Sequence, residues 1–163
     1  MRVPFLVALI APLSALALPA ELVAKHAGLP TFVERQAPAK PSPCQPISPA
    51  PTGDALKARA DAFAQAFIYK KNITEAFTYI NKGYINHNPA AQNGFDSAWS
   101  ILSPIWGQQS ITPLRTAFTD PQSWLNYQTG SFGEVVDRYR WEAGCIAEHW
   151  DQGEKFPTNA TVF

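Results

Sequence analysis

Apolar positions in the first half of the chain recur at helical spacing. Steps of three and four residues predict a helix over 54–71, because such steps place side chains on one helix face. Shorter apolar repeats predict helices over 73–80 and 94–102. The stripe of the first helix consists of Leu56, Ala60, Phe63 and Phe67. We expect this stripe to pack into the core.

From residue 111 onward, the pattern is typical of strands separated by turn residues. The expected strands are 111–118, 123–129, 134–141 and 145–152. Turn residues around Asp120 and Gly144 make neighbouring strands antiparallel. Helices followed by antiparallel strands predict an α+β fold. A curved sheet whose concave side is closed by helices would hold a cavity at its open end.

The two ends of the chain differ from this central region. Residues 1–18 are typical of a secretory signal peptide, in which Arg2 precedes an apolar run and a small-x-small cleavage site. The run is shorter than the ~20 residues that span a membrane, so we expect cleavage rather than an anchor. Residues 19–51 are expected to form an N-terminal arm and a Pro-rich linker without a core. The domain is expected over 52–155, with a tail over 156–163.

Cysteines and sequons also favour an extracellular protein. The chain has two cysteines, Cys44 and Cys145. An even number of cysteines is typical of proteins in an oxidising compartment, where disulfides form. A bridge between them would close a loop of about 100 residues, and the alternative is two free, buried thiols. Asn72 and Asn159 each begin an Asn-x-Thr sequon and are expected to carry glycans.

The charge balance and the motifs argue against several classes of protein. The chain has 13 basic and 13 acidic residues, and without a basic stripe nucleic acid is not an expected partner. The sequence has neither a Gly-rich phosphate loop nor the Gly-x-Ser-x-Gly motif of hydrolases. Histidines and aspartates do not occur at the spacing of a three- or four-ligand metal site, so we expect no metal.

Titratable side chains concentrate in the last two expected strands. Alternation puts His149 and Asp151 on one strand face, close enough to act on one ligand by proton transfer. Asp137 lies among bulky apolar residues, where desolvation disfavours a charge and would leave a hydrogen-bond donor. The alternatives are a salt bridge between Asp137 and an arginine, and a solvated strand end for His149 and Asp151. Of the other histidines, His87 could face the same cavity, whereas His26 lies in the arm.

Two segments resemble the motifs of SnoaL-like proteins. Residues 84–89, YINHNP, followed by Asn93 and Gly94, resemble the motif Tyr-x-x-His-Asn-Pro…Asp/Asn-Gly of that family. Residues 136–151, VDRYRWEAGCIAEHWD, resemble its block Asp-x-Phe-Arg…Gly-Lys-Ile-x-Glu-His-Trp-Asp. The resemblance covers roughly residues 54–152. Two motifs in the same order are fairly specific for the family and far less specific for a substrate.

The resemblance implies the NTF2-like fold, an α+β cone-shaped barrel with three N-terminal helices on a strongly curved antiparallel sheet. Such proteins usually form a homodimer through the outer sheet face. The resemblance also implies an enzyme of the cyclase, aldol-condensation, isomerase or dehydratase type that needs no cofactor. Its substrate would be a small apolar carbonyl compound, from which an acidic side chain removes a proton beside the carbonyl.

The residues carried over as catalytic are Asp151, His149, His87 and Asp137. Among them, Asp137 corresponds to the protonated oxyanion-hole aspartate of the related ketosteroid isomerases. The aromatic residues expected to form the substrate pocket are Tyr84, Trp99, Tyr127, Tyr139 and Trp141.

The chain also departs from the family pattern. Cys145 stands where the family commonly has a lysine, which fits a disulfide in a secreted branch. Residues 108–129, which would supply much of the pocket wall, match weakly. A secreted protein that kept the pocket as a noncatalytic small-molecule binding module is therefore the alternative to an enzyme.

Overall fold

The structure is a computed structural model that describes residues 36–158 and 161–162. The expected signal peptide, the arm up to residue 35 and Asn159 lie outside the described residues. The helices are α2 (Gly53–Ala64), its π-helical continuation η1 (Gln65–Tyr69), α3 (Ile73–Phe77), α4 (Phe95–Leu102) and the 3₁₀ turn η2 (Trp106–Gln108). The three predicted helices are therefore present. The second helix is shorter than predicted, because the chain enters a strand at Ile80.

Six strands form one mixed sheet in the order β1-β5-β4-β3-β2-β6. They are β1 (Ile80–Asn86), β2 (Ile111–Thr119), β3 (Gln122–Thr129), β4 (Gly133–Glu142), β5 (Cys145–Trp150) and β6 (Thr161–Val162). The strands from β2 to β5 form the predicted antiparallel meander.

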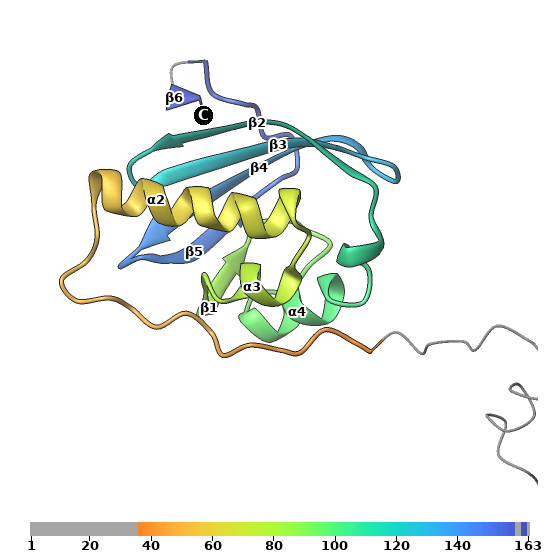
Figure 1. Cartoon of the computed structure of the whole chain (residues 1–163), viewed down its shortest axis with the longest axis horizontal. Helices are drawn as coiled ribbons and strands as arrows, with labels where there is room; N and C mark the ends of the chain where they lie inside the picture. Colours follow the sequence, from red (N-terminus) through yellow and green to blue (C-terminus); the bar gives the residue numbers. More distant parts are fainter. Residues whose placement is uncertain (1–35, 159–160, 163) are drawn as a thin grey trace, which may run out of the picture. The chain divides into compact units, whose positions relative to one another are not determined.

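The prediction of a strongly curved, antiparallel sheet is wrong in two respects. First, β1 pairs with β5 in parallel, because no tight turn joins these two strands and their orientation is free of the hairpin constraint. Second, the sheet is not strongly curled (Figure 1). The register shifts that would bend it occur at single points in three strand pairs.

Helix α2 lies across one face of the sheet, with α3 and α4 near β1 (Figure 1). The ring of Phe63 on α2 packs edge-on against Tyr139 and Trp141 of β4, at centroid distances of 4.9 and 6.1 Å. Aromatic pairs of this geometry contribute beyond the area they bury. The apolar stripe predicted for α2 is therefore the contact between the helix and the sheet.

The Pro-rich segment before α2 packs on the domain instead of standing apart as a linker. The compact unit of the chain begins at Ala37. The backbone N–H of Cys44 donates to the carbonyl of Ile80, at 2.8 Å, and that of Ile47 donates to Ala143, at 2.9 Å. Among the described residues, no helix is long and apolar enough to cross a membrane.

The predicted disulfide between Cys44 and Cys145 is confirmed, and it joins the Pro-rich segment to the first residue of β5. The two residues are 101 positions apart in the sequence. Both are buried, with exposed fractions of 8% and 1%. The disulfide therefore ties the start of the compact unit to the strand that leads into the candidate site.

Candidate active site

A cavity of about 850 Å³ lies between the helices and the sheet. Its apolar wall is mostly aromatic and includes Phe63, Phe67, Tyr84, Trp106, Tyr127 and Tyr139. Its polar groups come from the ends of β1 and β5 and from the middle of β4, and they include Asn86, Asn88, Asp137, His149 and Asp151. A largely apolar pocket with a few convergent polar groups is the usual form of a small-molecule site.

Asp137 is the most enclosed acid of the site, with an exposed fraction of 4%. Its Oδ2 accepts hydrogen bonds from the hydroxyls of Tyr127, at 2.8 Å, and Tyr139, at 3.0 Å. Desolvation by burial, reinforced by the charge of Asp137, raises the pKa of each tyrosine well above 10.0, so each hydroxyl keeps its proton and donates. Asp137 was expected to act as a hydrogen-bond donor. In the structure its Oδ2 accepts two hydrogen bonds, and its Oδ1 faces Nε2 of His149.

His149 faces an oxygen atom on each side of its ring. Its Nε2 lies 3.1 Å from Oδ1 of Asp137, and its Nδ1 lies 3.3 Å from Oδ1 of Asn86. The Asn86 atom is identified as oxygen because it accepts from the backbone N–H of Asn88, at 3.0 Å. Which of the two ring nitrogens donates depends on the tautomer of His149. Both ring nitrogens of His149, which we expect to move a proton, therefore face other protein groups.

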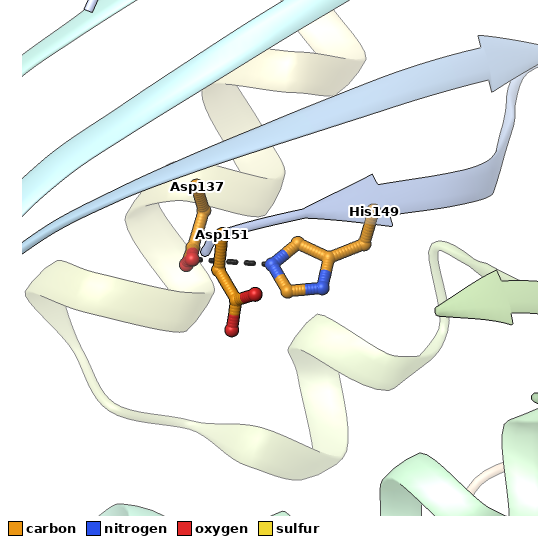
Figure 2. Close-up of side chains that lie close together, drawn as sticks. All are labelled: Asp137, His149 and Asp151. Atoms are coloured by element: carbon orange, nitrogen blue, oxygen red, sulfur yellow. Dashed lines mark hydrogen bonds and ion pairs between the residues drawn. The ribbon is translucent and has the colours of Figure 1, made fainter. Parts of the chain in front are cut away.

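Asp151 follows β5 and lies beside this pair. Its Oδ2 accepts from the side-chain amide of Asn88, at 2.7 Å. Its Oδ1 is buried and has no hydrogen-bond partner in the described part of the chain. Figure 2 shows the carboxylates of Asp137 and Asp151 converging with the ring of His149. A carboxylate oxygen that lacks a donor is available to take a proton from a ligand.

Among the residues that the structure describes, the same three side chains could hold a metal ion. One potential ligand atom from each of Asp137, His149 and Asp151 lies within 4.8 Å of the others. The sequence spacing did not reveal this set, because the strand pairing brings β4 against the end of β5.

Tyr84 supplies a further polar group of the wall. It is 4% exposed, and its ring lies 6.3 Å from that of His149. Burial, followed by the charges of Asp137 and Asp151, raises the pKa of Tyr84 well above 10.0. Its hydroxyl therefore stays protonated, and it makes no hydrogen bond to another described side chain. This group can donate to an oxygen atom of a ligand.

His87 does not join the cavity. Its Nε2 lies 2.8 Å from Oε2 of Glu148, and its ring stacks on Trp150 at 4.3 Å. The hydrogen bond to His87, opposed by desolvation and assisted by Arg140, lowers the pKa of Glu148. Because side chains of an extended segment alternate, Asn86 faces His149 and the next residue faces away. We therefore assign His87 to this outer group and not to the cavity.

Two of the five predicted pocket aromatics, Trp99 and Trp141, do not line the cavity. Trp99 packs edge-on against Phe77, at 5.0 Å. Trp141 is covered by Phe63 and donates its indole N–H to the hydroxyl of Ser123, at 2.9 Å. Their place in the cavity wall is taken by residues that we had assigned to the core or had not considered.

Sequence reasoning missed the part that Asn86, Asn88, Phe67 and Trp106 play in the site. The two asparagines belong to the motif over 84–89, which was the available signal. Trp106 stacks on Phe67 at 4.0 Å and donates its indole N–H to the carbonyl of the same residue, at 2.7 Å. The sequence gives no signal for this contact between η2 and the end of the first helix.

Comparisons with known proteins give similarities of structure alone. No family model matches the chain, and no curated protein matches it in sequence. A protein from Kribbella flavida DSM 17836 is 17% identical, with a TM-score of 0.49 over 58% of this chain and 82% of its own.

Two further structures are similar to the same extent. An NTF2-like protein of unknown function from Cytophaga hutchinsonii is 14% identical, with a TM-score of 0.49 over 59% of this chain and 96% of its own. A candidate SnoaL-like polyketide cyclase from Mesorhizobium loti is 15% identical, with a TM-score of 0.46 over 59% of this chain and 97% of its own. At TM-scores below 0.5, these similarities assign neither a family nor an activity.

Proposed function

We propose that this protein is a secreted, cofactor-independent acid–base enzyme of the SnoaL-like, NTF2-like type. It would act on a small apolar carbonyl compound by cyclisation, isomerisation or dehydration. The observation that carries this proposal is the buried Oδ1 of Asp151, which has no hydrogen-bond partner among the described residues and lies in a mostly apolar cavity. The two sequence segments that resemble the SnoaL-like motifs contribute the groups around this atom.

In the proposed reaction, Asp151 is the base. Its Oδ1 takes a proton from the carbon next to the substrate carbonyl, and the electron pair of that C–H bond moves to form an enolate. The hydroxyl of Tyr84 donates a hydrogen bond to the enolate oxygen, where negative charge develops. The proton then returns to another carbon in an isomerisation. In a cyclisation, the enolate carbon attacks a second carbonyl, whose oxygen receives the proton.

Asp137 and His149 support the base without touching the substrate in this scheme. The two tyrosine hydroxyls on Oδ2 fix the Asp137 carboxylate, and its Oδ1 fixes the ring of His149. A site whose groups are already oriented avoids the cost of arranging them during the reaction. We therefore assign positioning roles to Asp137 and His149.

Hydrogen–deuterium exchange of a model ketone tests the proposal. We expect the protein to accelerate exchange at the α-carbon of 2-tetralone, a neutral bicyclic ketone, in D₂O, as followed by proton NMR. Asp151→Asn should reduce this acceleration by about 100-fold or more, in line with the loss of a general base. Glu142→Gln removes a carboxylate from an exposed position of β4 and should leave the exchange unchanged. Exchange in the wild type that is no faster than in Asp151→Asn would refute the assignment.

The same assay includes EDTA in parallel samples. We expect EDTA to leave the exchange unchanged, because Asp151 acts through its own oxygen. Loss of exchange on addition of EDTA would instead assign Asp137, His149 and Asp151 as metal ligands.

A noncatalytic secreted binding module is the second candidate. It is favoured by the engagement of Tyr127, Tyr139 and both nitrogens of His149 with other protein groups. Few polar groups then remain for chemistry. Binding of 2-tetralone without faster exchange would support this candidate, and thermal stabilisation by the ligand would report the binding.

A further inference from the structure

The charged side chains that line the cavity are acidic. Glu134, Asp137, Asp151 and Glu154 line it, together with His149. No Lys or Arg from the described part of the chain belongs to the lining. Two cations contact lining residues: Arg138 pairs with Glu154, and Nζ of Lys71 donates to the backbone carbonyl of Gln109, at 3.2 Å.

The four carboxyl groups differ in their partners. Glu154 forms an ion pair with Arg138, at 3.0 Å, and Glu134 accepts from the side-chain amide of Asn126, at 2.9 Å. Oδ1 of Asp137 lies 3.1 Å from Nε2 of His149, and its Oδ2 accepts from the hydroxyls of Tyr127 and Tyr139.

In the described part of the chain, no cation pairs with Glu134 or with Asp151. Glu134 is exposed to solvent, which screens its charge, so the uncompensated carboxylate inside the cavity is that of Asp151. Its only hydrogen-bond donor among the described residues is the neutral amide of Asn88, and its Oδ1 has none. Its negative charge acts through a cavity with aromatic walls, where charge interactions are stronger than in water. The influence of this charge extends to Tyr84, whose pKa is raised by burial first and then by Asp137 and Asp151.

We propose that the cavity selects its ligands by charge, so that uncharged and cationic apolar molecules bind and carboxylates and phosphates are excluded. A protonated amine would donate to Oδ1 of Asp151, while its apolar part contacts the rings of the wall, whose faces also attract cations. Because it occupies the proposed base, such an amine acts as an inhibitor of the ketone reaction. The inference rests on the proposed function only in taking this cavity as the substrate site.

Three naphthalene probes with one ring system and different charges test this inference. They are 2-naphthylmethylamine, a cation at pH 7, 2-naphthylmethanol, which is neutral, and 2-naphthoate, an anion. Isothermal titration of the disulfide-bonded protein in EDTA measures each dissociation constant. We expect the amine to bind about tenfold or more tightly than 2-naphthoate, with the alcohol between them.

Two variants locate the source of the selectivity. Asp151→Asn keeps the shape of the side chain and should weaken amine binding by about tenfold, while binding of the alcohol changes about twofold at most. Glu142→Gln removes the same charge from an exposed position of β4 and should change neither value. If Asp151→Asn fails to fold, the order of the three dissociation constants measured on the wild type still tests the charge selectivity.

Several results would overturn the inference. They are 2-naphthoate binding as tightly as the amine, an amine preference that survives Asp151→Asn, and failure of all three probes to bind. None of the probes carries a carbonyl with an α-proton, so the titration does not depend on turnover. Loss of ketone exchange with retained charge selectivity would contradict the proposed function alone. Ketone exchange without charge selectivity would contradict this inference alone.

Discussion

The buried carboxylate of Asp137 provides a sharp test of how the site is held together. Tyr127→Phe and Tyr139→Phe each remove one hydroxyl from Oδ2 of Asp137 and keep the aromatic ring. The rings retain their own contacts, since Tyr139 packs against Phe63 at 4.9 Å and Tyr127 against Trp106 at 6.1 Å. The substitutions therefore isolate the two hydrogen bonds.

The expected loss of stability follows from the burial of Asp137, whose exposed fraction is 4%. Removing one donor from a buried carboxylate costs about 1.5–3 kcal/mol. After either single substitution, Oδ2 still accepts one hydrogen bond. After both, it accepts none from a tyrosine, so the double variant should lose more than the sum of the single losses, by about 1 kcal/mol.

Equilibrium urea unfolding, followed by tryptophan fluorescence, measures these losses as changes in the midpoint at constant slope. Tyr69→Phe is the matched control, because Tyr69 is 46% exposed and should lose at most about 0.5 kcal/mol. The reasoning is refuted if Tyr127→Phe and Tyr139→Phe lose no more than this control. Strict additivity in the double variant would show that the two hydroxyls do not share one acceptor in solution.

Three further predictions concern other parts of the chain. Replacing Cys44 and Cys145 by serine should cost about 4–5 kcal/mol on the chain-entropy model for a separation of 101 residues, as urea unfolding would measure, and a loss below about 1 kcal/mol would contradict this. Asn72→Ala should cost about 1 kcal/mol because its Oδ1 caps α3, whereas Asn72→Asp keeps the cap, and mass spectrometry of secreted protein should find a glycan at this position only in the wild type. The pKa of Glu148 is lowered, so its contribution to stability is present above its ordinary pKa of 4.5 and is lost as pH falls through the value in the folded state. Glu148→Gln should therefore destabilise the protein at pH 7 and not at the lowest pH that the fold tolerates, and a loss of stability independent of pH would contradict the ion pairing.

The local pattern of the sequence predicted most of the secondary structure. The meander from β2 to β5 was predicted to within two residues at each boundary, because alternation and turn residues are local signals. The stripe on α2 also predicted its packing face. Alternation places Asp137 and Tyr139 on one face of β4, where the hydroxyl of Tyr139 donates to Asp137.

Local signals did not predict the site as a whole. His149 contacts Asn86, and Asp151 contacts Asn88. The two residues of each pair are 63 positions apart in the sequence. These contacts arise because β1 pairs with β5 in parallel. No hairpin turn joins the two strands, so the local sequence does not predict that pairing. The same pairing turns His87 away from the cavity toward Glu148.

The sequence by itself determined the order of helices and strands, the single pair of cysteines and the polar residues available for chemistry. The tertiary structure alone decided which of those residues meet, which aromatic rings line the cavity and which are covered by α2. The physical reason is that alternation and helical spacing record the local conformation of the chain. The partners of a buried carboxylate depend on strands that are distant in the sequence and adjacent only after folding.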